Sequence, residues 1–228
     1  MKTIGLIGGM SWESTAHYYA ILNRETAKAL GGLHSASIVL NSVDFAPIAA
    51  MQSAGDWDSA GRELAAIAAS LETAGAELIG MTTNTMHICA DQIRAAISVP
   101  FVHIAAPTAD ALIADGIDKV ALLGTRFTME KRFYIDELER RGLEVIVPDV
   151  GITNLNGIIY EELVKGIVRD ESRRIYVDAI ARLQGRGAEA VILGCTEIGM
   201  LIDDSVSPLP TYDTTELHAK ALVAAALA

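Results

Sequence analysis

Residues 187–195 read GAEAVILGC, and residues 75–83 read GAELIGMTT. The two segments lie 112 positions apart (187 − 75), and each places Gly-Ala-Glu before a short apolar run. Short apolar runs of this kind are typical of buried strands. The same offset aligns Thr83 with Cys195. We therefore expect two equivalent strands, each followed at its carboxyl end by a side chain that can take part in chemistry.

Two further segments repeat in the same order. Residues 4–8 read IGLIG and resemble residues 120–124, VALLG, at an offset of 116 positions (120 − 4). Val99-Pro100 resembles Leu209-Pro210 at an offset of 110 positions (209 − 99). Repeats of this length are too long for a solenoid. They favour two similar domains, although chance similarity among strand–helix units is the alternative.

The chain alternates short apolar runs with longer helical segments. The expected strands are residues 3–6, 37–40 and 78–81, and the expected helices include residues 14–30 and 58–74. This alternation predicts an α/β fold with two pseudo-symmetric Rossmann-like domains, each a mostly parallel sheet flanked by helices. The expected domains are residues 1–98 plus 212–228, and residues 99–211. Because ligands of such sheets bind at the carboxyl ends of strands, Thr83 and Cys195 are expected to face one another across a cleft that holds the active site.

Composition excludes several classes of protein. The chain has 228 residues, of which 51% are hydrophobic and 21% charged, as in a folded globular protein. A formal net charge of −11 argues against nucleic-acid binding, which needs a basic face. Two cysteines do not make a disulfide framework. The apolar residues 219–228 are too few to cross a bilayer. We expect a cytoplasmic protein without a membrane partner.

Two polar motifs follow predicted strands. Residues 5–12, GLIGGMSW, form a glycine turn before a helix, but they match neither a dinucleotide-binding nor a P-loop pattern. The glycines permit a tight turn, and the amides at the helix start favour a carboxylate. Residues 82–87, TTNTMH, place more polar groups at a helix start than N-capping requires. This excess favours a functional role over simple capping.

The two cysteines are expected to differ. Cys89 lies within a predicted helix and is interpreted as a buried, inert thiol. Cys195 lies between a strand end and a predicted helix, whose N-terminus would lower the pKa of the thiol and make it a nucleophile or a proton acceptor. The histidines lie in separate segments without ligand spacing, so we expect no metal site; they are His17, His34, His87, His103 and His218.

These motifs together resemble the aspartate/glutamate racemase family. The residues that carry the resemblance are Gly8-Gly9-Met10, Asn84-Thr85-Met86-His87, Leu123-Gly124-Thr125 with Thr128, Ile159-Tyr160 and Gly194-Cys195-Thr196-Glu197. The stretches GGMSWEST at 8–15 and TNTMH at 83–87 are similar to the enterobacterial-type branch of broad-specificity amino-acid racemases. The resemblance implies an enzyme without a cofactor, a small amino-acid substrate and a homodimer.

The resemblance also implies the roles of individual residues. Thr83 and Cys195 would be the two acid/base residues that act on opposite faces of the substrate Cα. The substrate-binding positions it implies, together with those argued from specificity below, are Met10, Gln52, Asn84, Thr85, Lys165, Thr196 and Glu197. Most family members have Cys at both acid/base positions, and a hydroxyl is a far weaker acid than a thiol of ordinary pKa near ~8.5. The named branch also has Thr there, so we expect slow racemisation with unequal initial rates in the two directions.

The specificity positions also depart from the aspartate-specific pattern. The expected loop 44–52 lacks the usual Arg, and Lys165 lies one position later than usual, with Val164 in its place. An acidic side chain would then lose much of its charge pairing, whereas Gln52 offers a neutral hydrogen bond. We expect a broad or less acidic range of substrates, with glutamate and homoserine-like molecules as candidates.

Two alternatives stay open at this point. The first is another activity that uses one thiol, such as that of an arylmalonate decarboxylase-like, maleate isomerase-like or hydantoin racemase-like enzyme. The second is a non-catalytic amino-acid-binding relative, which the Thr at position 83 would suit.

Overall fold

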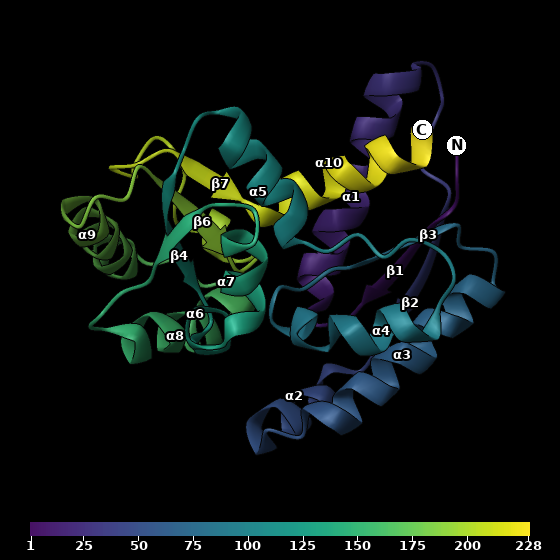
Figure 1. The fold of residues 1–228 in the computed structure, drawn as a ribbon, viewed down its shortest axis with the longest axis horizontal. Coiled ribbons are helices and arrows are strands. Elements are labelled where there is room, and N and C mark those ends of the chain that lie inside the picture. The colour runs from purple at the N-terminus through teal and green to yellow at the C-terminus, as the bar shows by residue number, and fades with distance from the viewer. The chain divides into compact units, whose positions relative to one another are not determined.

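The computed structural model describes residues 1–228 and divides into two compact units (Figure 1). Unit 1 comprises Met1–Ile104 and His218–Ala228, and unit 2 comprises Ala105–Leu217. Both crossings lie six residues beyond the expected boundaries (104 − 98 and 217 − 211). We describe the two units separately.

The sheet of unit 1 is parallel. Its strands are β1 (Ile4–Gly8), β2 (Ile38–Ser42) and β3 (Leu78–Met81), in the order β2-β1-β3. The helices of this unit are α1 (Trp12–Leu30), α2 (Phe45–Ala54), α3 (Trp57–Thr73), α4 (Ala90–Ala96) and most of α10 (Thr214–Leu227). A 3₁₀ turn, η1 (Thr85–Cys89), precedes α4.

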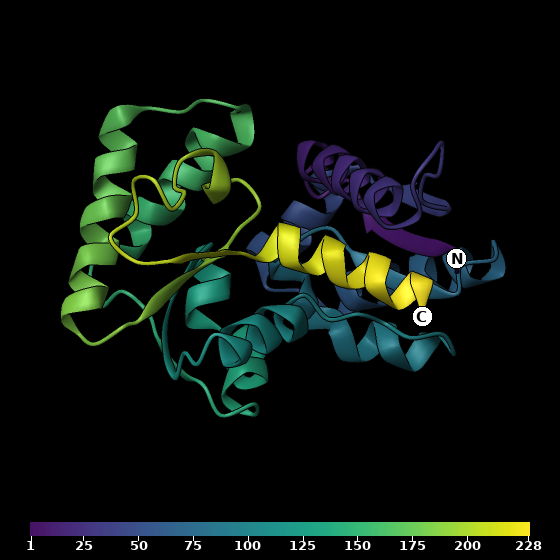
Figure 2. The same ribbon diagram turned by 90° about the horizontal axis from the view of Figure 1, so that it is seen from above.

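Alternate residues of β1 face the two helix layers of unit 1, as the period of a strand requires. Leu6 packs in a buried cluster with Leu22 of α1 and Leu222 of α10. Ile7 packs in the opposite cluster with Leu64 of α3. Figures 1 and 2 both show α10 lying beside α1. The carboxyl end of the sheet is therefore held between two apolar layers.

The sheet of unit 2 has the same parallel core with one more strand. Its strands are β4 (Lys119–Gly124), β5 (Glu144–Ile146), β6 (Ala190–Gly194) and β7 (Thr211–Asp213), in the order β5-β4-β6-β7. The helices are α5 (Ala105–Ala114), α6 (Arg126–Glu130), α7 (Arg132–Glu139), α8 (Ile152–Glu161) and α9 (Asp170–Gly185), with 3₁₀ turns η2 (Leu163–Lys165) and η3 (Ile198–Met200). Leu123 and Leu193 pack in one cluster with Ile180 of α9. The expected α/β class with parallel sheets is confirmed.

The repeated sequence segments make the same contacts in each unit. The Glu77 carboxylate accepts a hydrogen bond from the Thr3 N–H at 2.8 Å, and the Glu189 carboxylate accepts one from the Lys119 N–H at 3.0 Å. In both cases the glutamate before the third strand ties down the start of the central strand. The preceding glycines, Gly75 and Gly187, have φ of 97° and 92°. Gly-Ala-Glu therefore recurs because each unit has the same glycine turn and the same glutamate-to-backbone hydrogen bond, which we call the Gly-Ala-Glu clamp.

The crossing segments explain where the units divide. The Ile79 N–H donates to the Pro100 carbonyl at 2.8 Å, and the Val102 N–H donates to the Ile79 carbonyl at 2.9 Å. These bonds keep residues 99–104 on the edge of the first sheet. In unit 2 the Val191 N–H donates to the Pro210 carbonyl at 2.9 Å, and β7 pairs with β6. Pairing with β6 keeps residues 211–213 in unit 2.

The segment expected to be a loop at residues 44–52 is a helix. Asp44 is the N-cap of α2, and its carboxylate accepts a hydrogen bond from the Ala46 N–H at 3.1 Å. The expectation of a loop was wrong because an aspartate cap followed by alanine-rich sequence satisfies the helix start. Gln52 thus projects from a helix, and its side chain is buried.

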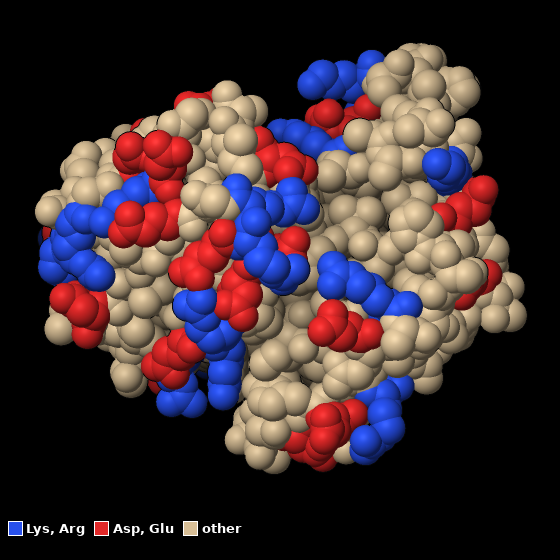
Figure 3. Space-filling model, in the orientation of Figure 1, with Lys and Arg blue, Asp and Glu red and all other residues tan.

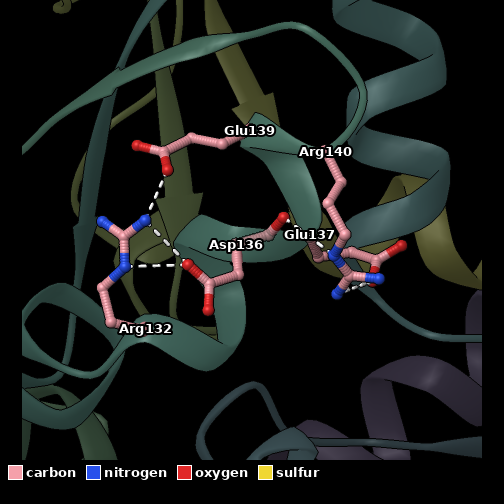
Figure 4. A network of polar contacts seen from close by, with 5 residues as sticks. All are labelled: Arg132, Asp136, Glu137, Glu139 and Arg140. Atoms are coloured by element: carbon pink, nitrogen blue, oxygen red, sulfur yellow. Dashed lines mark hydrogen bonds and ion pairs between the residues drawn. The ribbon is translucent and has the colours of Figure 1, made fainter.

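Helix α7 carries a network of ion pairs in which Glu137 is buried and the other side chains are more exposed (Figure 4). Arg132 contacts Asp136 at 2.7 Å and also pairs with Glu139, and Arg140 contacts Glu137 at 2.8 Å. Figure 3 shows Lys and Arg beside Asp and Glu over this face of unit 2. Exposed pairs of this kind stabilise a protein by at most about 1 kcal/mol each. No helix of the structure has both the length and the apolar character needed to cross a membrane.

Candidate functional site

Thr82 anchors the segment that follows β3. Its N–H donates to the Ile7 carbonyl at 3.0 Å, its hydroxyl lies 2.9 Å from that of Thr15, and its carbonyl accepts from the Ser14 hydroxyl at 2.9 Å. Thr82 is fully buried, whereas Thr83 is partly exposed. Of the two threonines, Thr82 therefore holds the backbone in place, and Thr83 is the one that a small molecule can reach.

Asn84 and Thr85 lie at the start of η1 and are 3% and 5% exposed. The Asn84 side chain does not cap η1, because it makes no hydrogen bond to the first turn. Capping therefore does not account for the polar side chain of Asn84. Substrate binding remains our prediction for Asn84 and Thr85.

The glycine turn after β1 is fixed by a close backbone contact and by a hydrogen bond to Thr15 of α1. Gly9 has φ of 93°, and a Cβ built there would lie 2.3 Å from the Val43 carbonyl oxygen, so only glycine fits. The Gly9 N–H donates to the Thr15 hydroxyl at 2.8 Å. The Gly9 amide is thus already occupied, and the expectation that the amides at the start of α1 favour a carboxylate stays a prediction. Met10, which follows, is buried.

Gln52 lies in the apolar layer of unit 1. Its side-chain amide donates to Sδ of Met86 at 2.9 Å, which brings α2 against the segment after β3. This contact uses one of the two N–H donors of the amide. Gln52 therefore lies near Met86, two residues from Asn84, with one of its donors engaged.

In unit 2, three of the predicted residues come together directly after β6. The Cys195 thiol donates to Oε2 of Glu197 at 2.9 Å, and the Thr196 hydroxyl donates to the same oxygen at 2.7 Å. Cys195 is 8% exposed. Lys165 does not join this group; it lies exposed on η2, after α8. The structure thus forms a compact thiol–carboxylate pair without a neighbouring lysine.

The pKa of the Cys195 thiol is raised well above its ordinary value, first by burial and then by the Glu197 carboxylate, with a smaller contribution from Asp213. The expected lowering of this pKa was wrong. The turn after Cys195 is only the three-residue η3, so no α-helix N-terminus faces the sulfur. Cys195 is consequently a neutral thiol at rest that donates its proton to a carboxylate.

Two tyrosines accompany this pair and were not predicted as site residues. The pKa of Tyr160 is raised to about 12, first by burial and then by its electrostatic interactions with Cys195 and Glu197. The Tyr176 hydroxyl donates to the Leu155 carbonyl at 3.1 Å, and its pKa is raised by burial and by Cys195. The Ile159-Tyr160 motif was the only sequence signal for either residue. Cys89 behaves as predicted, because burial raises its pKa to about 11.

Three histidines of unit 1 gather although their sequence positions do not suggest it. The His87 ring centroid lies 4.6 Å from that of His103 and 6.0 Å from that of His218. All three side chains are buried. The structure contains no group of His, Cys, Asp and Glu arranged to hold a metal ion. No spacing rule could have found the cluster, since it depends on α10 returning to unit 1.

Two α/β units, each with a parallel sheet flanked by helices, are the class of structure found in two-domain racemases. A model of the Asp/Glu/Hydantoin racemase family matches residues 7–222. The chain therefore belongs to the Asp/Glu/hydantoin racemase family.

Individual relatives agree with this assignment. A Yersinia pestis protein, provisionally named an Asp/Glu racemase, has 49% identity and a TM-score of 0.94, with 100% of each chain covered. An aspartate racemase homologue from Pyrococcus horikoshii OT3 has 35% identity and a TM-score of 0.87, also with 100% of each chain covered. The broad specificity amino-acid racemase RacX of Bacillus subtilis (strain 168) is 27% identical over 165 residues, which cover 71% of this chain and 70% of RacX.

Proposed function

We propose that the chain is a cofactor-independent amino-acid racemase in which Cys195 and Thr83 act on opposite faces of the substrate Cα. The observation that supports this most strongly is the equivalence of the two residues. Cys195 directly follows β6, and Thr83 lies two residues after β3; each of these strands pairs with the central strand of its unit. The Gly-Ala-Glu clamps before both strands have the same geometry. Inversion at a carbon needs one acid/base group on each face, which two equivalent units supply.

The neutral state of the Cys195 thiol suggests which proton-transfer steps Cys195 and Thr83 each carry out. As an acid, the neutral thiol gives its proton to the carbanion without a preparatory step. As a base, it must first lose that proton, and the Glu197 carboxylate at 2.9 Å is the acceptor in reach. The Thr83 hydroxyl is a much weaker acid, so its step is expected to limit the rate. The equilibrium constant between the enantiomers remains one.

The remaining predicted residues would hold the substrate. Asn84, Thr85 and Thr196 are proposed to bind its carboxylate and ammonium groups, which stabilises the carbanion formed at Cα. Met10, Gln52 and Lys165 would border its side chain. Because Gln52 is neutral, we propose a broad range of substrates that includes glutamate and homoserine-like molecules.

Exchange of the Cα hydrogen with solvent deuterium tests this function directly. Both enantiomers of each common amino acid are incubated with the protein in D₂O, and exchange and inversion are followed by NMR and chiral chromatography. We expect both for at least one amino acid, and we expect Cys195→Ala to abolish both. Cys89→Ala is the matched control, because that thiol lies in the apolar core of unit 1. A folded protein that exchanges no amino acid would refute the proposal.

A second candidate function is favoured by one observation, the neutral thiol of Cys195 with only a hydroxyl as its counterpart. Such a site suits protonation from one face, as in an arylmalonate decarboxylase-like reaction. A panel of malonates, maleate and hydantoins distinguishes this function. A non-catalytic binder would instead gain thermal stability with an amino acid and show no turnover, because a ligand that binds only the folded state stabilises it.

We also propose a homodimer in the cytoplasm. The family resemblance supports the dimer, and two free, buried cysteines suit a reducing compartment. Light scattering coupled to size-exclusion chromatography would measure the mass of the assembly, and a monomer at all concentrations would contradict the dimer.

A further inference from the structure

Consecutive carbonyl groups around Thr83 are both held by side chains of unit 1. The Ser14 hydroxyl donates to the Thr82 carbonyl at 2.9 Å. Nδ1 of His87 lies 2.8 Å from the Thr83 carbonyl oxygen. Because a carbonyl oxygen only accepts, Nδ1 must carry the hydrogen. The peptide groups on both sides of the Thr83 Cα are therefore fixed.

The second ring nitrogen of His87 determines its tautomer. The Ile104 N–H donates to Nε2 of His87 at 3.2 Å. An N–H can donate only to a nitrogen that keeps its lone pair, so Nε2 is unprotonated and Nδ1 is protonated. The two contacts require the same neutral tautomer. His87 is 1% exposed and Ile104 is fully buried, so water does not replace either contact.

The neighbouring His218 has the opposite tautomer. Its Nε2 lies 2.8 Å from the Val102 carbonyl oxygen and must donate. Its Nδ1 then accepts from the Tyr18 hydroxyl at 2.9 Å. The crossing segment thus presents a donor, the Ile104 N–H, to one histidine and an acceptor, the Val102 carbonyl, to the other. Val102 and Ile104, two positions apart on this segment, therefore fix two different imidazole states.

From this geometry we propose that His87 is a positioning residue for Thr83. Its Nδ1–H holds the Thr83 carbonyl, and the Ile104 N–H holds the imidazole in the tautomer that can do so. This proposal rests on the proposed function, because it assigns His87 a role only if the Thr83 hydroxyl takes part in inversion. A hydroxyl that is already a weak acid depends strongly on correct placement, and small displacements of reacting groups are costly.

Two substitutions separate the contacts of His87. In His87→Asn the side-chain amide occupies the place of Nδ1 and can still donate to the Thr83 carbonyl. In His87→Gln the amide reaches the place of Nε2, so its oxygen can accept from Ile104 while the donor to Thr83 is lost. Both variants remove the imidazole and leave a neutral amide, so each is the control for the other.

The measured quantity is a ratio of two rates: the rate at which the Cα hydrogen exchanges with retention of configuration, divided by the rate of inversion. For the enantiomer whose Cα–H faces Cys195, the thiol alone can exchange the hydrogen, whereas inversion also needs Thr83. We expect His87→Gln to raise this ratio by about tenfold or more, as a displaced reacting group would. His87→Asn should keep a ratio close to that of the wild type. If His87→Gln lowers both rates together and keeps the ratio of the wild type, its effect is a general one on the structure and the proposal is overturned.

The wild-type protein provides an independent measurement. Histidine ¹⁵N NMR should show His87 protonated at Nδ1 and His218 protonated at Nε2 at neutral pH. A His87 ring protonated at Nε2 would overturn the proposal even if no variant folds. If the wild type exchanges no amino acid, the proposed function fails instead. If it inverts normally and His87→Gln does not change the ratio, only the role of His87 fails.

Discussion

The Cys195 thiol donates a hydrogen bond to the Glu197 carboxylate across 2.9 Å. This contact couples the protonation of the sulfur to a negative charge two residues away. It raises the pKa of the thiol together with burial, which is the larger cause. The reactivity of Cys195 therefore depends on Glu197 as well as on its buried position after β6.

Replacing Glu197 by Gln should lower the pKa of the Cys195 thiol. The amide keeps the size of the side chain and removes the charge that opposes the thiolate, so we expect the pKa of the thiol to fall. Alkylation by iodoacetamide as a function of pH measures this value. The experiment is done in a Cys89→Ser background, so that only one thiol reacts. An alkylation midpoint that does not move would show that Glu197 leaves the sulfur unaffected.

Replacing Thr83 by Cys should raise the rate of inversion. A thiol is a much stronger acid than a hydroxyl, and acid/base groups contribute roughly 10²–10⁴-fold to such reactions. We expect initial rates in the two directions to become more similar, with the equilibrium constant unchanged. Thr83→Ala should instead lower inversion and spare exchange at the Cys195 face. Equal initial rates in the wild type and both variants would exclude a role for position 83.

Acid should destabilise unit 1 through its buried histidines. Burial lowers the pKa of His218 to about 4 and that of His87 well below 6.5. Because folded-state values are lowered, the unfolded chain binds more protons below pH ~6.5, and stability is lost as the pH falls from there towards 4. For His218 alone the loss at pH 5 is about 2 kcal/mol.

Urea unfolding at pH 7 and pH 5 measures this acid sensitivity. His218→Gln should reduce it, because an amide does not titrate. His17→Gln is the matched control, since that histidine is exposed on α1. If both variants lose the same stability between the two pH values as the wild type, the histidine cluster is not the cause.

Replacing Gly9 by Ala should unfold or strongly destabilise the protein. The new Cβ would lie 2.3 Å from the Val43 carbonyl oxygen, in a backbone conformation with φ of 93° that non-glycine residues avoid. We expect a loss of about 2 kcal/mol or more in the free energy of unfolding. Gly157→Ala on α8 is the matched control, because no atom lies within 4 Å of its new Cβ and its φ is helical. That variant should gain about 0.5–1 kcal/mol.

Much of the architecture could be predicted from local patterns. The repeat of Gly-Ala-Glu reports a real turn and clamp, so it locates two equivalent strands and the residues after them. Helix α2 was missed although Asp44 and Pro47 are helix-start signals, because the segment was interpreted through its resemblance to a loop. The N-cap signal of Asp44 alone would predict a helix here.

The electrostatic state of the candidate site could not be predicted. The pKa of Cys195 depends on how deeply β6 is buried and on where the Glu197 side chain points, and neither is a property of the local sequence. The same holds for His87, His103 and His218, which meet only because the chain returns to unit 1 after residue 217. Burial and long-range contacts, rather than sequence motifs, determine the protonation states of the Cys195 thiol and of these histidines.

The Lys2 N–H donates to the Ala226 carbonyl at 2.7 Å, and α10 completes one apolar layer of unit 1. During synthesis, β1 therefore leaves the ribosome long before the helix that covers one of its faces. Unit 2 is continuous in sequence, so its strands and helices are all available first. We expect the order of folding to be the reverse of the order of translation, with β1 exposed to solvent or chaperones while unit 2 is already formed.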